Sequence, residues 1–363
     1  MFQKRREQLV SRMQQQSIDV AVLVPGSNMY YFTGLQLKQS ERLTVAAITA
    51  HHQLYFLVPQ VELTKIDVSY GGTILSYSDE EGPSQAIQQL KKELATAQTL
   101  GVEFDTMRVK EQKAIESLTY DTLCDIGETI RDIRMEKDEH EIALMRQAVQ
   151  IVEESLAATL PIIQAGISEM EVAAQLEYEM RRRGSEGTPF GTIVASGYRG
   201  ALPHGRASTK KIETGELIVI DFGAIYKGGY VADMTRTVAL GEVSPTLKTI
   251  YSVVKQANET AIAAIKPGMT AHAIDDLARG IIRDAGYGDY FTHRLGHGIG
   301  LSAHEEPYMM QRNQLVLKPG MAFTVEPGIY VQDVGGVRIE DNLIVTEDGY
   351  ENLMTYSKEL IIL

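Results

Sequence analysis

The chain has 363 residues, of which 44% are hydrophobic and 23% charged, and its formal net charge is −13 at pH 7. This length predicts two domains, and the acidic balance argues against a nucleic-acid partner, which would favour a basic surface. The sequence contains no run of about 18 apolar residues, so no membrane span is predicted. Cys124 is the single cysteine, which excludes a disulfide within the chain and fits a reducing cytoplasm.

The first 125 residues alternate between helix-like and strand-like patterns. The basic start lacks the hydrophobic core and cleavage site of a secretory signal, so it predicts a structural helix. Helices are predicted over residues 1–16, 83–96 and 109–118, and strands over residues 18–24, 43–49, 53–58 and 100–104. The alternation predicts an α/β domain with a mixed sheet, residues 1–125, without a phosphate-binding glycine loop. The aromatic run before Gly34 is interpreted as core or turn packing, with a wall of a neighbouring active site as the alternative.

Residues 126–137 are expected to link this domain to a second one, residues 138–363. Asp138 and Glu141 have the spacing of a capping box, which marks the start of a helix. Apolar residues then recur every three or four positions as far as Leu160, which predicts a long amphipathic helix.

The second domain contains a repeated pattern. Ile163–Ser168 closes one predicted helix and begins the next, and Ile265–Thr270 does the same 102 residues later. The helices that follow are expected to end near Gly184 and Gly286, again 102 residues apart. Because each second helix leads to an acid-bearing hairpin pattern, we interpret the domain as a duplicated helix–helix–hairpin unit.

Residues 217–235, LIVIDFGAIYKGGYVADMT, predict a β-hairpin, because apolar and β-branched runs flank a turn at Lys227–Gly229. Asp221 and Asp233 lie on opposite arms, so the hairpin would bring two carboxylates together. Burying acids is costly and facing acids repel, whereas a bound divalent cation relieves both problems. Two unrelated acids on a solvent-exposed edge are the alternative.

Residues 321–342 repeat this device, with Glu326 and Glu340 on either side of a turn predicted at Gly335–Gly336. Between the two hairpins lies a glycine-rich stretch, GHGIG, that contains His297. Four carboxylates and one imidazole suit divalent metals such as Mn, Co, Fe or Zn. The charge of four carboxylates exceeds what one ion needs, so the sequence predicts a site for two metal ions.

These motifs resemble those of the pita-bread metallopeptidases, family M24, which include methionine aminopeptidase, aminopeptidase P and prolidase. The motifs IDFGA, VADMTRT, GHGIGL, TVEPGIY and VRIEDN hold, in order, the residues that match the metal ligands: Asp221, Asp233, His297, Glu326 and Glu340. The first domain resembles the creatinase-like domain of the aminopeptidase P and prolidase branch. The resemblance implies an α/β N-terminal creatinase-like domain followed by an α+β pita-bread catalytic domain with internal pseudo-twofold duplication.

The resemblance also assigns roles to residues outside the ligand set. His204 in LPHG matches a histidine near the substrate carbonyl, and His304 in SAHEEP matches one that contacts the substrate peptide, which implies catalytic roles for both. His293, Arg338 and Tyr330 match groups close to the metals and are expected to contribute to substrate binding. The alternatives are neutralisation of carboxylate charge by Arg338 and simple packing by Tyr330.

The activity that the resemblance implies is metal-dependent hydrolysis of the bond between an N-terminal residue and proline, with manganese the favoured metal. Glu326 is the expected proton shuttle. The chain length resembles that of short microbial X-Pro dipeptidases, so dipeptides are the favoured substrate. Aminopeptidase P activity on longer X-Pro peptides is the alternative. The complete ligand set argues against a binding module, whereas a non-peptidase hydrolase or a lyase on the same scaffold is a further alternative, because fold does not fix function.

The family also implies a homodimer, in which the N-terminal domain of one subunit limits access to the partner's active site. The loop Gly34–Arg42 is the candidate for that contact. A dipeptidase must bind the carboxylate that follows proline, and a basic side chain does this best. Arg199 and Arg206, on either side of His204, are candidates, as are Lys38 and Arg42 from a partner.

Overall fold

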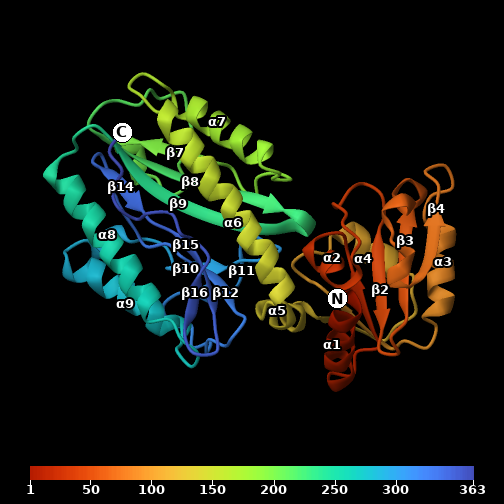
Figure 1. Cartoon of the computed structure of the whole chain (residues 1–363). Helices are drawn as coiled ribbons and strands as arrows, with labels where there is room; N and C mark the ends of the chain where they lie inside the picture. Colours follow the sequence, from red (N-terminus) through yellow and green to blue (C-terminus); the bar gives the residue numbers. More distant parts are fainter. The chain divides into compact units, whose positions relative to one another are not determined.

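The computed structural model describes residues 1–363, apart from the side chain of Val68. The chain divides into two compact units, Met1–Arg134 and Met135–Leu363, called here the N-terminal and C-terminal units (Figure 1). None of the helices formed by the described residues combines the length and the hydropathy that crossing a membrane requires.

The N-terminal unit is a six-stranded mixed sheet with helices, as the alternating pattern predicts. The sheet has the order β4-β3-β2-β1-β5-β6, with antiparallel β1–β2 and β2–β3 pairs and parallel pairs elsewhere. Its strands are β1 (Val20–Leu23), β2 (Val45–Thr49), β3 (Leu54–Pro59), β4 (Thr73–Tyr77), β5 (Thr99–Val102) and β6 (Thr122–Asp125). Its helices are α1 (Phe2–Gln15), α2 (Ser27–Thr33), α3 (Ser84–Glu93), α4 (Val109–Ile115) and α5 (Gly127–Met135), with 3₁₀ turns η1 (Gln60–Lys65) and η2 (Val68–Tyr70).

All predicted helices and strands of this unit are present, but the sequence did not predict β4, β6, α2 or α5. The aromatic run before Gly34 forms α2, and its Tyr31 and Phe32 are buried, which confirms the packing interpretation. Helix α5 occupies most of the segment expected to be a linker.

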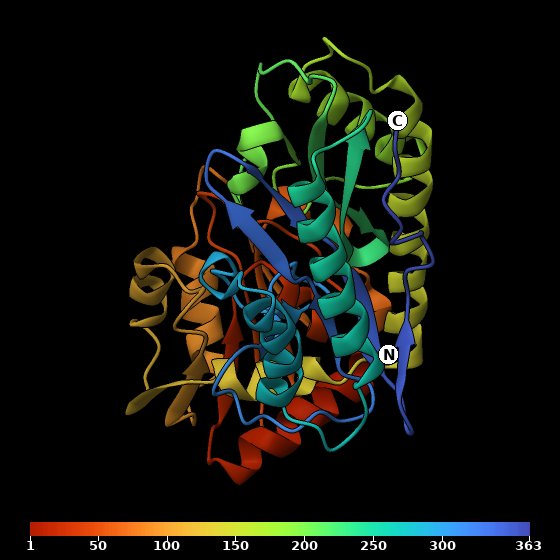
Figure 2. The ribbon, with the colours of Figure 1, turned by 90° about the vertical axis from the view of Figure 1, so that its left-hand side faces the viewer.

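The C-terminal unit repeats a helix pair followed by strands, in agreement with the duplicated pattern. Helices α6 and α7 precede β7–β9, and α8 and α9 precede β10–β16. Helices α8 and α9 lie side by side in both views (Figures 1 and 2). The helices are α6 (Glu139–Thr159), α7 (Glu169–Arg182), α8 (Pro245–Ala263) and α9 (Ala271–Asp284), with 3₁₀ turns η3 (Leu160–Ile162), η4 (Gly197–Ala201), η5 (Lys227–Gly229) and η6 (Gly288–Tyr290).

The strands of this unit form three sheets, ordered β7-β8-β9, β11-β10-β12-β15-β16 and β13-β14. They are β7 (Ile193–Ser196), β8 (Glu216–Tyr226), β9 (Tyr230–Leu240), β10 (Gly296–Gly298), β11 (Glu305–Met309), β12 (Ala322–Val325), β13 (Gly328–Val331), β14 (Gly335–Arg338), β15 (Asp341–Val345) and β16 (Tyr350–Asn352).

Local signals set the ends of these helices. The Asp138 side chain accepts a hydrogen bond from the Glu141 backbone amide at 2.9 Å and completes the predicted capping box of α6. A second capping box, built on Ser168, begins α7. Beyond the ends of α7 and α9, Gly184 and Gly286 take φ angles of 98° and 85°, a left-handed conformation that favours glycine.

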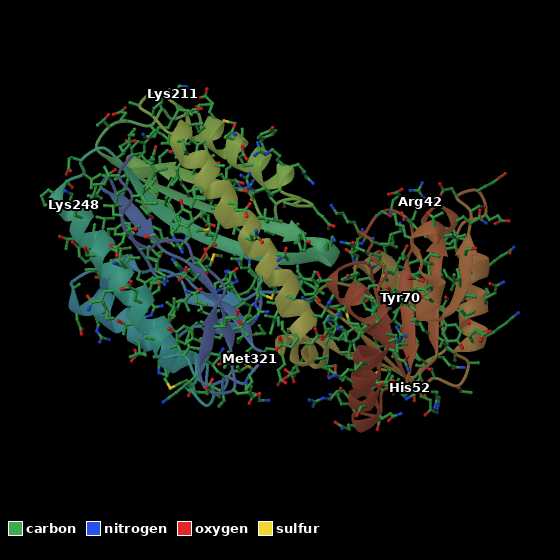
Figure 3. The ribbon with its side chains drawn as sticks, viewed as in Figure 1. Arg42, His52, Tyr70, Lys211, Lys248 and Met321 are labelled. Carbon is green, nitrogen blue, oxygen red and sulfur yellow. The ribbon has the colours of Figure 1, made fainter. Side chains whose placement is uncertain are left out.

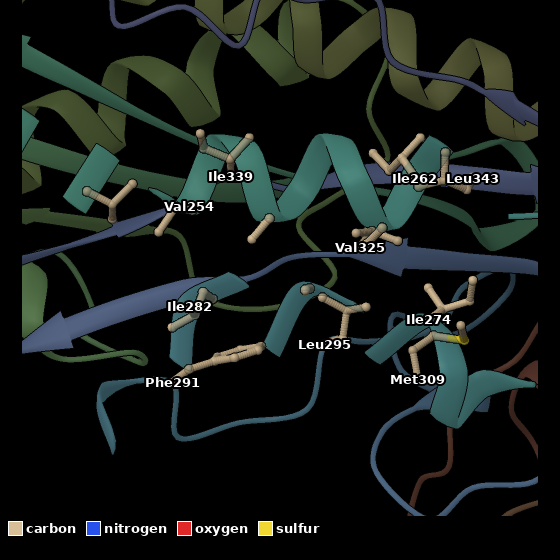
Figure 4. Close-up of a cluster of buried hydrophobic side chains, with 14 of the residues drawn as sticks. Val254, Ile262, Ile274, Ile282, Phe291, Leu295, Met309, Val325, Ile339 and Leu343 are labelled. Carbon is tan, nitrogen blue, oxygen red and sulfur yellow. The ribbon is translucent and has the colours of Figure 1, made fainter. Parts of the chain in front are cut away.

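The core of the C-terminal unit lies between the helix pair α8 and α9 and the strands beside it (Figure 4). Burial of each such aliphatic side chain contributes about 1.5–3 kcal/mol. The side chains that pack together include Val254, Ile262, Ile274, Ile282, Phe291, Leu295, Val325, Ile339 and Leu343. Charged side chains such as Lys211 and Lys248 lie instead on the exposed surface of this unit (Figure 3).

The first hairpin, β8–β9, is an unbroken antiparallel ladder from Glu216 opposite Leu240 to Tyr226 opposite Tyr230. Its turn lies at η5, as predicted. Asp221 faces Thr235, two residues beyond Asp233, so the two acids lie diagonally across the ladder on one face of the sheet.

The second hairpin differs from the prediction in the position of its turn. Val331 pairs with Gly335, so the turn lies at residues 332–334, and Gly335 and Gly336 belong to strand β14. Asp333, with φ 61°, takes the left-handed conformation in the turn. Gly336 is needed for a close approach instead, because a Cβ atom there would lie 2.1 Å from the carbonyl oxygen of Gly200.

Candidate metal centre and its cavity

The five predicted ligands line one cavity of about 500 Å³ in the C-terminal unit. His204, His293, His304 and Arg338 line the same cavity, whereas Tyr330 does not. The full lining is Phe190, Gly191, Ile193, Pro203, His204, Arg206, Asp221, Asp233, His293, Arg294, His297, His304, Glu326, Arg338 and Glu340.

The two hairpins meet where their acids lie, because polar groups bond across from one to the other. The Glu340 amide donates to the carbonyl of Thr235 at 3.1 Å. The side chain of Asn342 accepts from the amide of Asp233 at 3.1 Å and donates to its carbonyl at 2.6 Å. Thus Asn342 satisfies the backbone of Asp233 as a neighbouring strand would, and β9 and β15 are fixed together at the site.

Three of the predicted ligands form a tight buried group. Asp233, His297 and Glu340 each offer one ligand atom, and these atoms lie within 4.8 Å of one another. Glu326 is next to them, with its Oε1 3.2 Å from Nε2 of His297. Asp221 is not part of this tight group, and its Oδ2 accepts a hydrogen bond from the Arg338 guanidinium.

The ring of His297 is oriented with one nitrogen toward the carboxylates. Its Nδ1 lies 3.1 Å from the carbonyl oxygen of Gly298, and because a carbonyl only accepts, Nδ1 carries the proton. Nε2 is therefore the nitrogen that faces the acids, 3.2 Å from Oε1 of Glu326, and the one that a metal ion would bind. Strand β10 admits only glycine beside this residue, since a Cβ at Gly296 would lie 1.9 Å from the Thr324 carbonyl oxygen and one at Gly298 2.1 Å from that of Glu306.

The charge in this group is not balanced by the described residues. One carboxylate oxygen each of Asp221, Asp233 and Glu340 is buried without a hydrogen-bond partner among them. Burial and the neighbouring carboxylates raise the pKa of Asp233 and of Glu340 well above the usual range. Divalent cations would satisfy the unpartnered oxygens and offset the repulsion, so the residues present fit a metal site.

Glu326 differs from the other acids. Burial raises the pKa of its carboxyl, but the hydrogen bond and positive charge of His297 outweigh that effect and hold the pKa at about 2. Its side chain is 15% exposed, slightly more than that of Asp221 at 12% and clearly more than that of Asp233 at 5%. Glu326 is therefore a charged carboxylate with access to the cavity.

Two histidines lie at the open side of the group. The ring of His304 packs edge-on against His297 with centroids 4.1 Å apart, and burial followed by the His297 charge lowers the pKa of His304 to about 4. This makes His304 a neutral imidazole at pH 7. His204 is exposed in the loop between η4 and β8 and reaches the cavity from that loop.

A chain of hydrogen bonds runs behind the acids. Arg338 Nη1 donates to the Tyr330 hydroxyl at 2.7 Å, and this hydroxyl lies 2.9 Å from Nε2 of His293. Nδ1 of His293 lies 2.7 Å from the carbonyl oxygen of Arg294 and donates a hydrogen bond to it. Nε2 therefore accepts a hydrogen bond from the Tyr330 hydroxyl. Burial lowers the pKa of His293 and raises that of Tyr330 to about 12, so both are neutral here. Tyr330 thus supports the site from outside the cavity.

The cavity wall contains residues that the sequence alone did not single out. Phe190, Ile193 and Pro203 supply an apolar side, and Arg294 adds a guanidinium that stacks on Tyr308 at 4.3 Å. The sequence signals that could have pointed to these residues were weak: Phe190 stands between a proline and a glycine just before a strand, and Arg294 follows His293.

Of the two arginines proposed to reach the far end of a substrate, only one is in place. Arg206 lines the cavity. Arg199 instead donates to the buried carboxylate of Glu169 and, at 3.0 Å, to the Arg206 carbonyl. The expectation for Arg199 is therefore wrong, because a buried acid competes successfully for its guanidinium.

The fold and the site define a class of protein, a metal-dependent peptidase. Residues 143–347 match the model of metallopeptidase family M24, and residues 5–136 match that of the creatinase/prolidase N-terminal domain. The chain belongs to metallopeptidase family M24. This confirms the expected order of a creatinase-like domain and a pita-bread catalytic domain.

Individual relatives are similar along almost the whole chain. The chain is 38% identical over 360 residues to the Xaa-Pro dipeptidase of Pyrococcus furiosus, which covers 99% of this chain and 100% of that relative. The solved Xaa-Pro dipeptidase from Bacillus anthracis has a TM-score of 0.91 and 36% identity, with 100% of both chains covered. The X-Pro aminopeptidase from Thermotoga maritima has a TM-score of 0.87 and 35% identity, with 99% of both chains covered.

Proposed function

We propose that this protein hydrolyses X-Pro dipeptides in a reaction that depends on two divalent metal ions. The observation that carries the proposal is the group of four acids and one histidine with three unpartnered buried oxygens, placed at one side of a cavity. The names of the similar dipeptidases support the choice of substrate.

The residues that would hold the metals are the five that the sequence predicts: Asp221, Asp233, His297, Glu326 and Glu340. When bound, two such ions lower the pKa of a water molecule and polarise the scissile carbonyl. The Arg338 guanidinium fixes one oxygen of Asp221 and leaves the other toward the site. Thr235 does the same for Glu340, whose Oε2 accepts from its hydroxyl at 2.7 Å.

Glu326 is proposed to move the proton. A charged carboxylate with access to the cavity can accept a proton from the attacking water and deliver it to the leaving nitrogen. For an X-Pro bond this delivery is essential, because the proline nitrogen carries no hydrogen in the peptide and must gain a proton to leave as a secondary amine. His304, neutral at pH 7, and His204 are proposed to donate hydrogen bonds to the substrate carbonyl oxygen as charge develops there.

The wall of the cavity supports a dipeptide. The apolar side chains of Phe190, Ile193 and Pro203 suit the proline ring. A dipeptide also ends in a carboxylate after that ring, and Arg206 and Arg294, which line the cavity, are proposed to bind it. His293 and Tyr330 are proposed to contribute to binding through the hydrogen-bonded chain that ends at Arg338.

The test combines metal analysis with kinetics on Ala-Pro and Ala-Ala. We expect purified protein to carry divalent metal, to lose activity after chelation and to regain it with Mn²⁺ or Co²⁺. Full activity without bound metal would contradict the proposal. Cleavage of Ala-Ala as fast as Ala-Pro would contradict proline specificity.

Release of the first residue from longer X-Pro peptides is the second candidate function. It is favoured by the similarity to the X-Pro aminopeptidase from Thermotoga maritima. Rates on Ala-Pro, Ala-Pro-Ala and an Arg-Pro-Pro peptide decide between the two. The dipeptidase proposal expects Ala-Pro to be cleaved fastest, and Arg206→Ala or Arg294→Ala to raise KM for Ala-Pro more than for Ala-Pro-Ala.

Three further features are proposed on chemical grounds. Manganese is the favoured metal, ahead of cobalt, zinc or iron, because four of the five proposed ligands are carboxylates. Elemental analysis of protein purified without added metal tests this.

A cytoplasmic location fits a chain with one cysteine, and cell fractionation tests it. A homodimer in which the loop Gly34–Arg42 contacts the partner's site predicts a two-subunit mass in sedimentation and lower activity when that loop is shortened.

A further inference from the structure

A fully buried carboxylate on α7 holds the loop that carries His204. The Glu169 side chain has an exposed fraction of 0% and lies in the first turn of the helix. It accepts hydrogen bonds from both ends of this loop, which runs over residues 196–208. The donors are the Ser196 amide at 2.8 Å, the Ser196 hydroxyl at 3.0 Å, the Ser208 amide at 3.1 Å, the Ser208 hydroxyl at 2.7 Å and the Arg199 guanidinium.

These bonds close the loop at its base. Arg199, held by Glu169, also donates to the carbonyl of Arg206 at 3.0 Å, so the two sides of the loop are joined on either side of His204. Arg338 adds a hydrogen bond to the Pro203 carbonyl at 3.2 Å. His204 itself is exposed, so its position depends on the loop backbone rather than on side-chain packing.

A second fully buried carboxylate lies on α9, the corresponding helix of the other half, and acts together with an arginine of its own helix. Asp275 is 0% exposed and binds Arg279 through two hydrogen bonds of 2.8 and 2.9 Å. It also accepts from the Leu295 amide at 3.1 Å. Arg279 in turn donates to the carbonyls of Phe291 and His293 at 3.1 and 2.9 Å. This acid–arginine pair therefore holds the segment 291–295, which carries His293.

We propose that Glu169 and Asp275 are positioning residues for the reaction, one for His204 and the other for His293. The inference rests on the proposed function, because it concerns where these histidines lie relative to a substrate. Charge-assisted hydrogen bonds are stronger and shorter than neutral ones, so each carboxylate restricts its segment to one conformation. Small displacements of a catalytic group reduce the rate strongly, about 100-fold for 1 Å.

Crossed double-mutant cycles test this proposal, with each half serving as the control for the other. The single variants are Glu169→Gln, Asp275→Asn, His204→Ala and His293→Ala. We expect Glu169→Gln to lower kcat for Ala-Pro by roughly tenfold or more. In the His204→Ala background Glu169→Gln should lower kcat no further. In the His293→Ala background it should lower kcat as much as it does in the wild-type protein. Asp275→Asn should show the reverse pattern, because coupling is confined to groups that share a network.

Hydrogen exchange and metal content provide readouts that do not depend on activity. Glu169→Gln should speed amide exchange in residues 196–208 only, and Asp275→Asn in residues 291–295 only, with wild-type metal content in both. Glu171→Gln is the matched control for α7, because the side chain of this exposed acid accepts from Ser168 at the same helix end and from Lys211, which lies beyond the His204 loop. It should change neither kcat nor exchange in that loop.

The outcomes separate this inference from the proposed function. Additive losses in both crosses, or faster exchange throughout the unit, would overturn the positioning roles. If the wild-type protein cleaves no X-Pro peptide, the proposed function fails, and the exchange pattern alone decides whether the two carboxylates hold their segments. Where a carboxamide variant does not fold, Arg199→Lys and Arg279→Lys keep each carboxylate, lose the planar donor geometry and are expected to give the same pattern more weakly.

Discussion

The two acid-bearing hairpins of the C-terminal unit each contribute two carboxylates to the site, but their strands are paired differently. In the first, the β8–β9 ladder is continuous and its acids are diagonal. In the second, pairing stops after Val325 opposite Asp341 and resumes at Gly328 opposite Arg338 in the same register. Glu326 and Glu340 therefore lie opposite each other in the gap. The comparison shows that opposing acids, which repel, are accommodated where the ladder is open.

Several backbone groups beside this gap are bonded from outside the hairpin. Asn258 on α8, 0% exposed, donates to the carbonyls of Val325 and Ile339 at 3.0 and 3.1 Å. The Glu326 amide donates to the carbonyl of Leu295 at 2.8 Å. The backbone of the second hairpin thus depends on hydrogen bonds from neighbouring elements, whereas that of the first is held by its own ladder.

The largest effect is expected when either hairpin loses an acid. Asp233→Asn and Glu340→Gln should each lower metal affinity by more than about 100-fold, because even groups that only support a ligand cost about 10–100-fold. Metal titration and kcat/KM measure this. Asp284→Asn, an exposed acid on α9, is the control and should change neither. Retention of full activity after loss of one hairpin's acid would show that a single hairpin suffices.

A large loss of stability is expected from crowding beside the second hairpin. Gly296→Ala would place a Cβ 1.9 Å from the Thr324 carbonyl oxygen on β12, which forces strands apart and should cost about 3 kcal/mol. Chemical denaturation measures it. In Gly280→Ala the new Cβ meets only Arg283 Nη2 at 3.7 Å, so this variant should be more stable, by about 0.5–1 kcal/mol.

The role of Asn258 sharpens the comparison further. Asn258→Ala leaves the Val325 and Ile339 carbonyls without these donors and should cost about 1–3 kcal/mol. It should also lower metal affinity, since both carbonyls directly precede a glutamate of the site. Ser252→Ala is the control on the same helix, because the exposed Ser252 hydroxyl donates to the Lys248 carbonyl of that helix at 3.0 Å. Equal effects of the two variants on metal affinity would contradict this role.

The smallest effects are expected at the two turns. Gly228 and Asp333 have similar left-handed φ angles of 74° and 61°. Gly228→Ala should cost about 1 kcal/mol, because this conformation strains a Cβ. Asp333→Gly should change the free energy of unfolding by less than about 0.5 kcal/mol, since aspartate already tolerates the conformation. A large gain from Asp333→Gly would mean that the second turn is strained.

Sequence patterns predicted the elements that have strong local signals. The capping box at Asp138, the turn at Lys227–Gly229 and the amphipathic helices are encoded within a few residues of each other, so they could be predicted. The turn of the second hairpin could not, because Gly336 is required by Gly200, a residue distant in the sequence. Strands β4 and β6 bury few of their residues, so their sequences gave only weak local patterns.

For the candidate site, the identities of the five predicted ligands came from motifs, and the structure brings all of them to one cavity. What could not be predicted was the competition for charged side chains. Arg199 pairs with Glu169, a residue thirty positions earlier, and only the folded chain shows that this acid is buried beside it. Arg294 was missed because a basic residue beside a histidine gives no signal of where it points.

The shared register on both sides of the gap limits how the second hairpin can change in length. Two residues on each arm are unpaired in the gap. The pairs beyond it therefore keep the register of the pairs before it, which begin with Ala322 opposite Ile344. A one-residue insertion in either arm would turn every later side chain of that arm to the opposite face of the sheet. Glu326 and Glu340 could then no longer face each other. Insertions in this hairpin are therefore tolerated at the turn around Asp333, or in matched pairs on both arms.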